Sequence, residues 1–137
     1  FTSVDQIRSV LLTGTGGTGK TRLALETGTR LLDAFRDGVW LVELALLTDA
    51  ARLPGTIIAT LGLREEPDRP ATDTLLDALR RQNLLLILDN CEHLPGGVAA
   101  LGSRLLKACP DLRLLATSRS ALGIAGEVTL PVPPLAI

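Results

Sequence analysis

Residues 14–21 read GTGGTGKT, and this octet constrains the possible fold more than any other feature of the sequence. It has the form G-x-x-x-x-G-K-[ST], follows the apolar run Val10-Leu11-Leu12 and precedes the helix-forming stretch TRLALETGTRLL. In a loop of this kind the glycines permit a tight turn, and backbone N–H groups and the helix dipole favour a bound anion. The octet therefore predicts a phosphate-binding loop between a strand and a helix.

The individual residues of this loop have expected roles. Lys20 is expected to reach the β- and γ-phosphates of a nucleotide, and the Thr21 hydroxyl to bind Mg²⁺. A chance match is the alternative, but only two lysines occur in the chain, Lys20 and Lys107, and one of them occupies the required position. The predicted nucleotide-binding residues are Gly14, Thr15, Gly16, Gly17, Thr18, Gly19, Lys20, Thr21 and Arg22.

Composition favours one domain without a nucleic-acid or membrane surface of its own. The 137 residues suffice for a single core, the net charge is −1, and the basic residues are scattered along the chain. The longest apolar run, 84–88, is far too short for a membrane span. The two cysteines lack metal-ligand spacing and no secretory signal segment is recognisable in these residues, so we expect reduced thiols. We expect a cytoplasmic domain that contacts neither nucleic acid nor membrane directly.

Apolar runs alternate with segments of helical period along the chain, which is typical of a parallel α/β fold. The expected strands are 9–13, 39–44, 84–88, 112–117 and 127–130. The expected helices are 20–35, 49–62, 72–82 and 95–108. The sequence thus predicts a three-layer α/β sandwich of the P-loop NTPase type around a parallel five-stranded sheet.

The run 83–90, NLLLILDN, ends an apolar strand in an acid, as a Walker B site requires. Asp89 is the predicted metal-side carboxylate, and it would bind Mg²⁺ largely through water. Many P-loop ATPases place a glutamate next, but here Asn90 follows, and the next acid is Glu92. An amide can orient a water but cannot accept its proton. Either Glu92 acts as the base, or turnover is slow and the domain behaves as a switch.

Arg119 follows the predicted strand 112–117, at the carboxyl edge where open parallel sheets bind ligands. A guanidinium at this edge can pair with phosphate in a bidentate manner and read the γ-phosphate, and Thr117 and Ser118 could add hydroxyls nearby. The alternative is a surface arginine in a loop. The predicted catalytic residues are Lys20, Asp89, Glu92 and Arg119, and the predicted metal ligands are Thr21 and Asp89.

Four segments together resemble the STAND class of signalling ATPases, which includes the NB-ARC domains. They are GTGGTGKTRLALE, DGVWLVELALLTD, LLLILDNCEHL and CPDLRLLATSRSALGIAGE, the last followed by LPVPPL. The strongest likeness is to the nucleotide-binding domain of large bacterial transcriptional regulators of the LuxR and antibiotic-regulator types. The resemblance implies strand order 5-1-4-3-2, with Arg119 facing the γ-phosphate.

The same resemblance implies a switch that holds ADP at rest and exchanges it for ATP on a signal, often with self-association. Its partners would be the lid, winged-helix, sensor and DNA-binding domains of the same polypeptide. Residues 1–137 are expected to form a truncated nucleotide-binding domain. We expect it to lack the family's upstream Gly-Arg-Glu adenine-contact segment and its downstream lid and winged helix, and we expect 131–137 to begin a linker.

Two other functions remain open at this point. A P-loop kinase or transferase would pass the phosphoryl group to a small molecule, although no acceptor lid is evident. A folded fragment that has lost nucleotide binding is the other. A GTPase is disfavoured because the guanine-reading Asn-Lys-x-Asp motif is absent.

Overall fold

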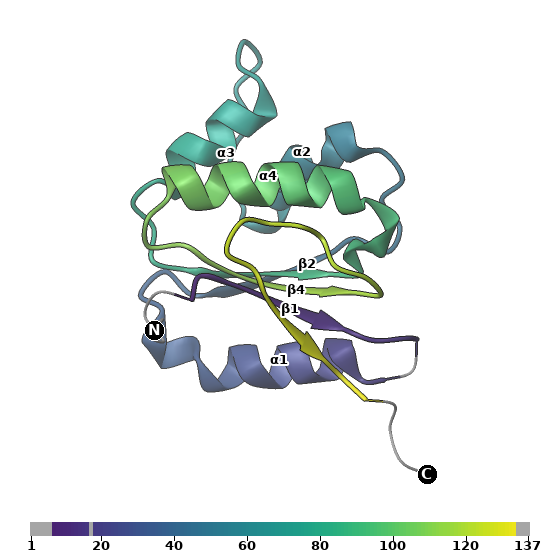
Figure 1. The fold of residues 1–137 in the computed structure, drawn as a ribbon. Helices are drawn as coiled ribbons and strands as arrows, with labels where there is room; N and C mark the ends of the chain where they lie inside the picture. The colour runs from purple at the N-terminus through teal and green to yellow at the C-terminus, as the bar shows by residue number, and fades with distance from the viewer. Residues whose placement is uncertain (1–6, 17, 134–137) are drawn as a thin grey trace.

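The computed structural model describes residues 7–16 and 18–133, which form a parallel five-stranded sheet with helices on both faces (Figure 1). The strand order is β2-β3-β4-β1-β5, and every neighbouring pair is parallel. The fold class and the strand order implied by the resemblance are both confirmed. The strands are β1 (Ser9–Thr13), β2 (Val39–Glu43), β3 (Leu85–Asp89), β4 (Arg113–Ser118) and β5 (Val128–Pro131).

The helices are divided unequally between the two faces of the sheet. Figure 1 shows α1 alone below the sheet, and α2, α3 and α4 together above it. Their bounds are α1 (Lys20–Arg30), α2 (Leu53–Thr60), α3 (Ala71–Leu79) and α4 (Pro95–Ala108), with 3-10 turns η2 (Leu32–Ala34), η3 (Ala50–Arg52) and η4 (Cys91–His93).

Within the described ranges, no helix combines the length and the apolar character that crossing a membrane would require.

Several segment boundaries differ from the sequence-based expectation; for example, the helices predicted over 49–62 and 72–82 are the shorter α2 and α3. The helix predicted over 20–35 ends at Arg30, and Leu31 leaves the helical region before a separate 3-10 turn. At the other end of the chain β5 continues to Pro131, which pairs with Thr13, so the sheet includes the first residue of the predicted linker. Residues 134–137 of that linker lie outside the described part of the chain.

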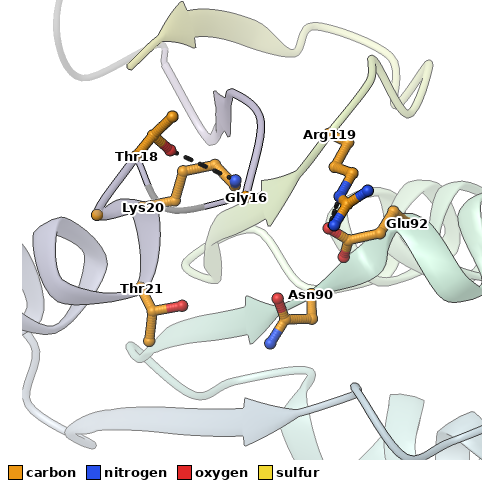
Figure 2. Close-up of a pocket in the computed structure, with 8 residues that line it drawn as sticks. Gly16, Thr18, Lys20, Thr21, Asn90, Glu92 and Arg119 are labelled. Atoms are coloured by element: carbon orange, nitrogen blue, oxygen red, sulfur yellow. Dashed lines mark hydrogen bonds and ion pairs between the residues drawn. The ribbon is translucent and has the colours of Figure 1, made fainter. Parts of the chain in front are cut away.

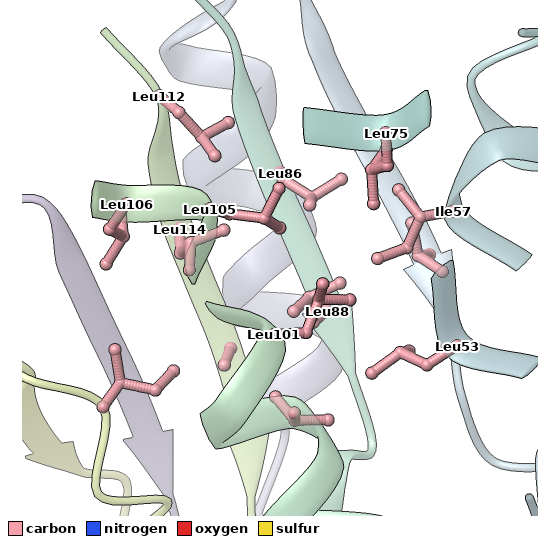
Figure 3. Close-up of a cluster of buried hydrophobic side chains, with 14 of the residues drawn as sticks. Leu53, Ile57, Leu75, Leu86, Leu88, Leu101, Leu105, Leu106, Leu112 and Leu114 are labelled. Atoms are coloured by element: carbon pink, nitrogen blue, oxygen red, sulfur yellow. The ribbon is translucent and has the colours of Figure 1, made fainter. Parts of the chain in front are cut away.

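The inner strand β3, between β2 and β4, is buried on both sides, as expected for a strand inside a parallel sheet. Leu86 and Leu88 belong to the larger core under α2, α3 and α4, whereas Leu85 and Ile87 belong to the smaller core under α1. Figure 3 shows Leu86 and Leu88 beside leucines of α4. The alternation arises because successive side chains of a strand point to opposite faces. Burial on both faces makes β3 a rigid support for the acid at its end.

Arg8 joins the start of the sheet to the carboxyl end of α4. Its guanidinium donates to the carbonyl oxygens of Leu106 (2.8 Å), Leu112 (3.3 Å) and Cys109. The last carbonyls of a helix have no partner within it, and a nearby cation is favourable there. Arg8 thereby fixes β1, which leads into the phosphate loop, against the helix layer.

We expect Arg8→Ala to lower the free energy of unfolding by about 2 kcal/mol, because three buried or half-buried carbonyls lose a charged donor. Urea denaturation measures this difference. Arg8→Lys should recover only part of it, because an ammonium lacks the planar fork of donors. Arg104→Ala, an exposed change on α4, is the matched control. Equal effects of Arg8→Ala and Arg104→Ala would contradict the role given to Arg8.

Candidate functional site

The carboxyl ends of β1, β3 and β4 meet at one edge of the sheet, and a pocket of about 170 Å³ opens there. Figure 2 shows side chains from the phosphate loop, from the segment after β3 and from the end of β4 around it. A volume of this size suits a phosphate group better than a whole nucleotide, since small-molecule sites commonly span about 300–1,000 Å³. The lining residues are Gly16, Thr18, Gly19, Lys20, Thr21, Asn90, Glu92 and Arg119.

Glycine is required in the loop by close contact and by backbone conformation. A Cβ at Gly14 would lie 2.9 Å from the Thr18 hydroxyl and 2.9 Å from the Val132 carbonyl oxygen. Gly19 has a φ of 85°, in the left-handed region that other residues rarely adopt, and α1 begins directly after it. That helix has no side-chain cap and no acid in its first turn. Its amino end is therefore open to an anion.

The Lys20 side chain is held inside the loop and is largely buried. Its ammonium donates to the carbonyl oxygens of Gly14 (2.7 Å) and Thr15 (2.9 Å). This cation lies beside the amino end of α1, so the loop combines a full positive charge with a helix dipole. The combination provides the electrostatic conditions for binding a phosphate.

Asp89 is fully buried at the end of β3 and accepts hydrogen bonds from two threonines. Thr21 Oγ1 lies 3.0 Å from both carboxylate oxygens, and Thr117 Oγ1 lies 2.5 Å from one of them. Burial raises the pKa of Asp89 even though these hydroxyls favour the charged form, and the charge of Glu43 adds to the rise. Thr117, proposed from the sequence as a neighbour of Arg119, thus supports Asp89 instead.

The hydroxyl of Thr21 and the carboxylate of Asp89 form a donor set suited to Mg²⁺. Both are hard oxygen ligands, and Mg²⁺ takes one or two such protein ligands while keeping water and phosphate oxygens. Their separation of 3.0 Å places them together at the mouth of the loop. The residues present therefore fit this ion.

Glu43 is a site residue that the sequence reasoning missed. It ends β2, pairs in register with Asp89 across the sheet, and accepts a hydrogen bond from the Asn90 side-chain amide at 2.9 Å. Partial desolvation of this largely exposed carboxylate would raise the pKa of Glu43, but hydrogen bonds from Asn90 and from the Ala45 backbone N–H outweigh that effect and lower the pKa. One signal was available: 39–43 is also an apolar strand that ends in an acid, as the strand before Asn90 does.

Glu92, in η4 after β3, and Arg119, directly after β4, both line the pocket and lie next to each other (Figure 2). Glu92 lies in η4, is mostly buried, and has one carboxylate oxygen 3.9 Å from Arg119 Nε. Arg119 extends toward the loop, so that a Cβ on Gly16 would lie 3.3 Å from its Nη2. Arg119 is the more exposed of the two residues, so its guanidinium is accessible to an anion in the pocket. Neither residue is an isolated surface side chain.

Most of the predicted binding segment is brought together, with two exceptions. The Arg22 side chain is exposed and pairs with Glu26 at 3.2 Å on the outer surface of α1, so it does not join the pocket. Gly17 lies outside the described residues. Gly14 and Thr15 contribute through carbonyl oxygens that hold Lys20 rather than by lining the pocket.

Comparison with known proteins gives relatives among bacterial regulators. The chain is 44% identical over 132 residues to a protein of Mycobacterium tuberculosis (strain ATCC 25618 / H37Rv) named "Putative HTH-type transcriptional regulator". The match covers 96% of this chain and 15% of that protein. The chain thus spans about a seventh of the length of this relative.

Several solved structures share the fold at low sequence identity. One is the Aeropyrum pernix ORC2 protein, solved as ADPNP-ADP complexes, with a TM-score of 0.62 and 17% sequence identity. The match covers 90% of this chain and 41% of the ORC2 chain. Another is Drosophila ORC bound to AT-rich DNA and Cdc6, with a TM-score of 0.64 and 18% sequence identity. The match covers 93% of this chain and 49% of the chain in that structure. Similarity to a DNA-bound structure does not support the expectation that this domain makes no contact with nucleic acid.

A STAND protein with a tetratricopeptide-repeat sensor from Pyrococcus horikoshii also shares the fold, with a TM-score of 0.59 and 14% identity. The match covers 94% of this chain and 21% of that one. Because structures of other kinds match this chain equally well, this similarity does not show that the chain belongs to the STAND class.

A model of the AAA domain family matches residues 4–125, which include the phosphate loop, Asp89 and Arg119. Since this match spans most of the sequence, the chain belongs to the family of AAA domains.

Proposed function

We propose that this chain is an ATP- and ADP-binding switch domain of a multidomain transcriptional regulator, with slow Mg²⁺-dependent hydrolysis. The observation that carries the proposal is that Lys20, Thr21 and Arg119 line one pocket at the amino end of α1, where Thr21 also donates a hydrogen bond to the buried Asp89. Each of these groups complements a different part of a metal-bound triphosphate.

The phosphate chain is bound by the loop and its lysine. Backbone N–H groups of the loop and the amino end of α1 would surround the β-phosphate. The Lys20 ammonium would release its two loop carbonyl oxygens and donate its hydrogen bonds to phosphate oxygens instead. Thr21 and Asp89 would hold Mg²⁺, which supplies neutralising charge for the phosphate oxygens. Arg22 contributes only through its backbone, because its side chain is turned away.

Arg119 distinguishes the two nucleotide states in this proposal. Its guanidinium pairs with Glu92 and reaches over Gly16, on the side of the pocket opposite Thr21 (Figure 2). A γ-phosphate offers it a bidentate partner that ADP lacks. Arg119 would then change its partner from Glu92 to the γ-phosphate. This change would signal to the segment after β4 which nucleotide is bound.

Slow turnover follows from the groups near the attacking water. Asn90 occupies the position where many P-loop ATPases have a glutamate, and it cannot accept a proton. Glu92 is the remaining candidate base, but its carboxylate is paired with Arg119. A domain with a long-lived ATP state is suited to signalling rather than to product formation.

The partners of this domain would be other domains of the same polypeptide. The name of the mycobacterial relative indicates a DNA-binding output, and the chain spans only 15% of that relative. We infer that lid, winged-helix and sensor domains of the STAND and LuxR kind act on this switch in the cytoplasm, with self-association in the ATP state. DNA contact is assigned to the output domain rather than to this one.

Thermal unfolding with nucleotide tests the proposal. ATP or ADP with Mg²⁺, at 100 times its dissociation constant, should stabilise the domain by about 2.7 kcal/mol. GTP at the same concentration should give a smaller shift. No shift with any nucleotide would contradict the proposal and favour a scaffold that does not bind nucleotide. Phosphoryl transfer to a small molecule faster than hydrolysis would favour a kinase instead.

A further inference from the structure

The side-chain amide of Asn90 has both of its N–H groups engaged by carboxylates. Its Nδ2 donates to Glu43 Oε1 at 2.9 Å and to Asp89 Oδ2 at 3.2 Å. A carboxamide has two N–H donors and one carbonyl acceptor. Because a carboxylate can only accept, the two acids fix which end of the amide faces them. Asn90 is thereby held in one of its two amide orientations.

This orientation turns the Asn90 carbonyl oxygen toward the phosphate pocket. Figure 2 shows the nitrogen directed at β2 and the oxygen directed at the space between Lys20 and Glu92. Asn90 itself lines the pocket, whereas Glu43 does not. The pocket thus receives a fixed hydrogen-bond acceptor opposite the phosphate loop.

The backbone of Asn90 and the side chain of Glu43 are fixed as well. The Asn90 N–H donates to Thr117 Oγ1 at 2.8 Å, and the residue has a φ of 63°. The same Glu43 oxygen accepts from the Ala45 N–H at 2.8 Å. Register pairing of Glu43 with Asp89 aligns the two strand ends. Glu43 can therefore position the amide without rearrangement of its own.

We propose that Glu43 is a positioning residue for hydrolysis, which acts by holding the Asn90 carbonyl toward the attacking water. The inference rests on the proposed ATPase function and adds a role that Asp89 alone cannot fill. In the step, the water oxygen forms a bond to the γ-phosphorus, and the bond from phosphorus to the β–γ bridging oxygen breaks. ADP leaves with that electron pair, and the water proton passes to the phosphoryl group, giving inorganic phosphate.

The test is hydrolysis of Mg²⁺-ATP by the intact protein under single-turnover conditions, with ATP affinity measured separately. Glu43→Ala should lower the hydrolysis rate about tenfold, because the amide loses one of its two anchors. ATP affinity should change by less than about twofold, because Glu43 does not line the pocket. Glu43→Gln should restore most of the rate, since its carbonyl oxygen can still accept from Asn90.

A double substitution separates positioning from a structural role. In an Asn90→Gly background, which tolerates the left-handed backbone, Glu43→Ala should lower the rate no further. Glu65→Ala, at an exposed glutamate of the α2–α3 loop, is the matched control and should leave the rate unchanged.

Three results would overturn the inference. They are an unchanged rate in Glu43→Ala, an equal further loss in the Asn90→Gly background, and ATP binding without any hydrolysis by the unsubstituted protein. The last result leaves nucleotide binding intact. A protein that binds no nucleotide at all would instead overturn the proposed function.

Discussion

Lys20→Ala is expected to weaken ATP binding about a hundredfold, which corresponds to about 2.8 kcal/mol. Lys20 carries the full positive charge of the phosphate loop, and its ammonium is buried among loop carbonyls rather than spread in solvent. A charge-assisted hydrogen bond in such a place is stronger than one at the surface. Calorimetric titration of the intact protein with Mg²⁺-ATP measures the change.

Lys107→Ala provides the control for this experiment, since Lys107 is the other lysine of the chain and lies exposed in the last turn of α4. It should leave the affinity for ATP unchanged. The unfolding curve of Lys20→Ala without nucleotide should remain cooperative, which separates lost binding from lost folding. An affinity within about threefold of the unsubstituted protein would contradict the assignment of Lys20.

Asp89→Asn is expected to reduce Mg²⁺-dependent hydrolysis at least about a hundredfold, because removal of a group that stabilises transition-state charge costs this much or more. The amide keeps the shape of the side chain but offers one acceptor where the carboxylate offers two. Thr21, Thr117 and Asn90 all donate to Asp89 at present, so one of them must lose its acceptor. Hydrolysis measured across a range of Mg²⁺ concentrations should show a lower maximal rate and a higher Mg²⁺ concentration at half of that rate, because one anionic ligand is lost.

The same substitution should hardly change stability without nucleotide. Burial raises the pKa of Asp89, which means that its charged form is disfavoured in the fold. Removing the charge relieves this cost and offsets the weakened hydrogen bonds, so we expect the free energy of unfolding to change by less than about 1 kcal/mol. A large loss of stability would show that Asp89 serves the fold rather than the metal site.

The parts of the site that the sequence predicted are those governed by local rules. The loop at 14–21 can be read because glycine, lysine and threonine have fixed places in a strand-loop-helix unit. Asp89 and Arg119 follow apolar strands, and parallel strands bring their carboxyl ends to one edge. To predict that these residues meet at one edge of the sheet therefore required only the order of the strands.

Contacts set by strand register were not predictable in this way. Glu43 meets Asn90 and Asp89 only because β2 and β3 pair with Glu43 opposite Asp89, and an exposed acid at a strand end has many possible partners. Arg8 reaches α4 across a distance of about a hundred residues in sequence, as its bond to Leu106 shows. The end of α1 was misplaced for a related reason: apolar spacing continues to Phe35, but the chain must turn back toward β2 after Arg30.

The left-handed backbone of Asn90 bears on how the catalytic rate of this domain could be raised. Glutamate, the residue that many ATPases have at this position, pays roughly 1 kcal/mol to adopt such a conformation, whereas asparagine adopts it readily. A glutamate at position 90 would also bring a third negative charge beside Glu43 and Asp89. Asn90→Glu alone is therefore expected to raise the rate little unless Glu43 is neutralised and the chain between β3 and η4 relaxes from its left-handed conformation.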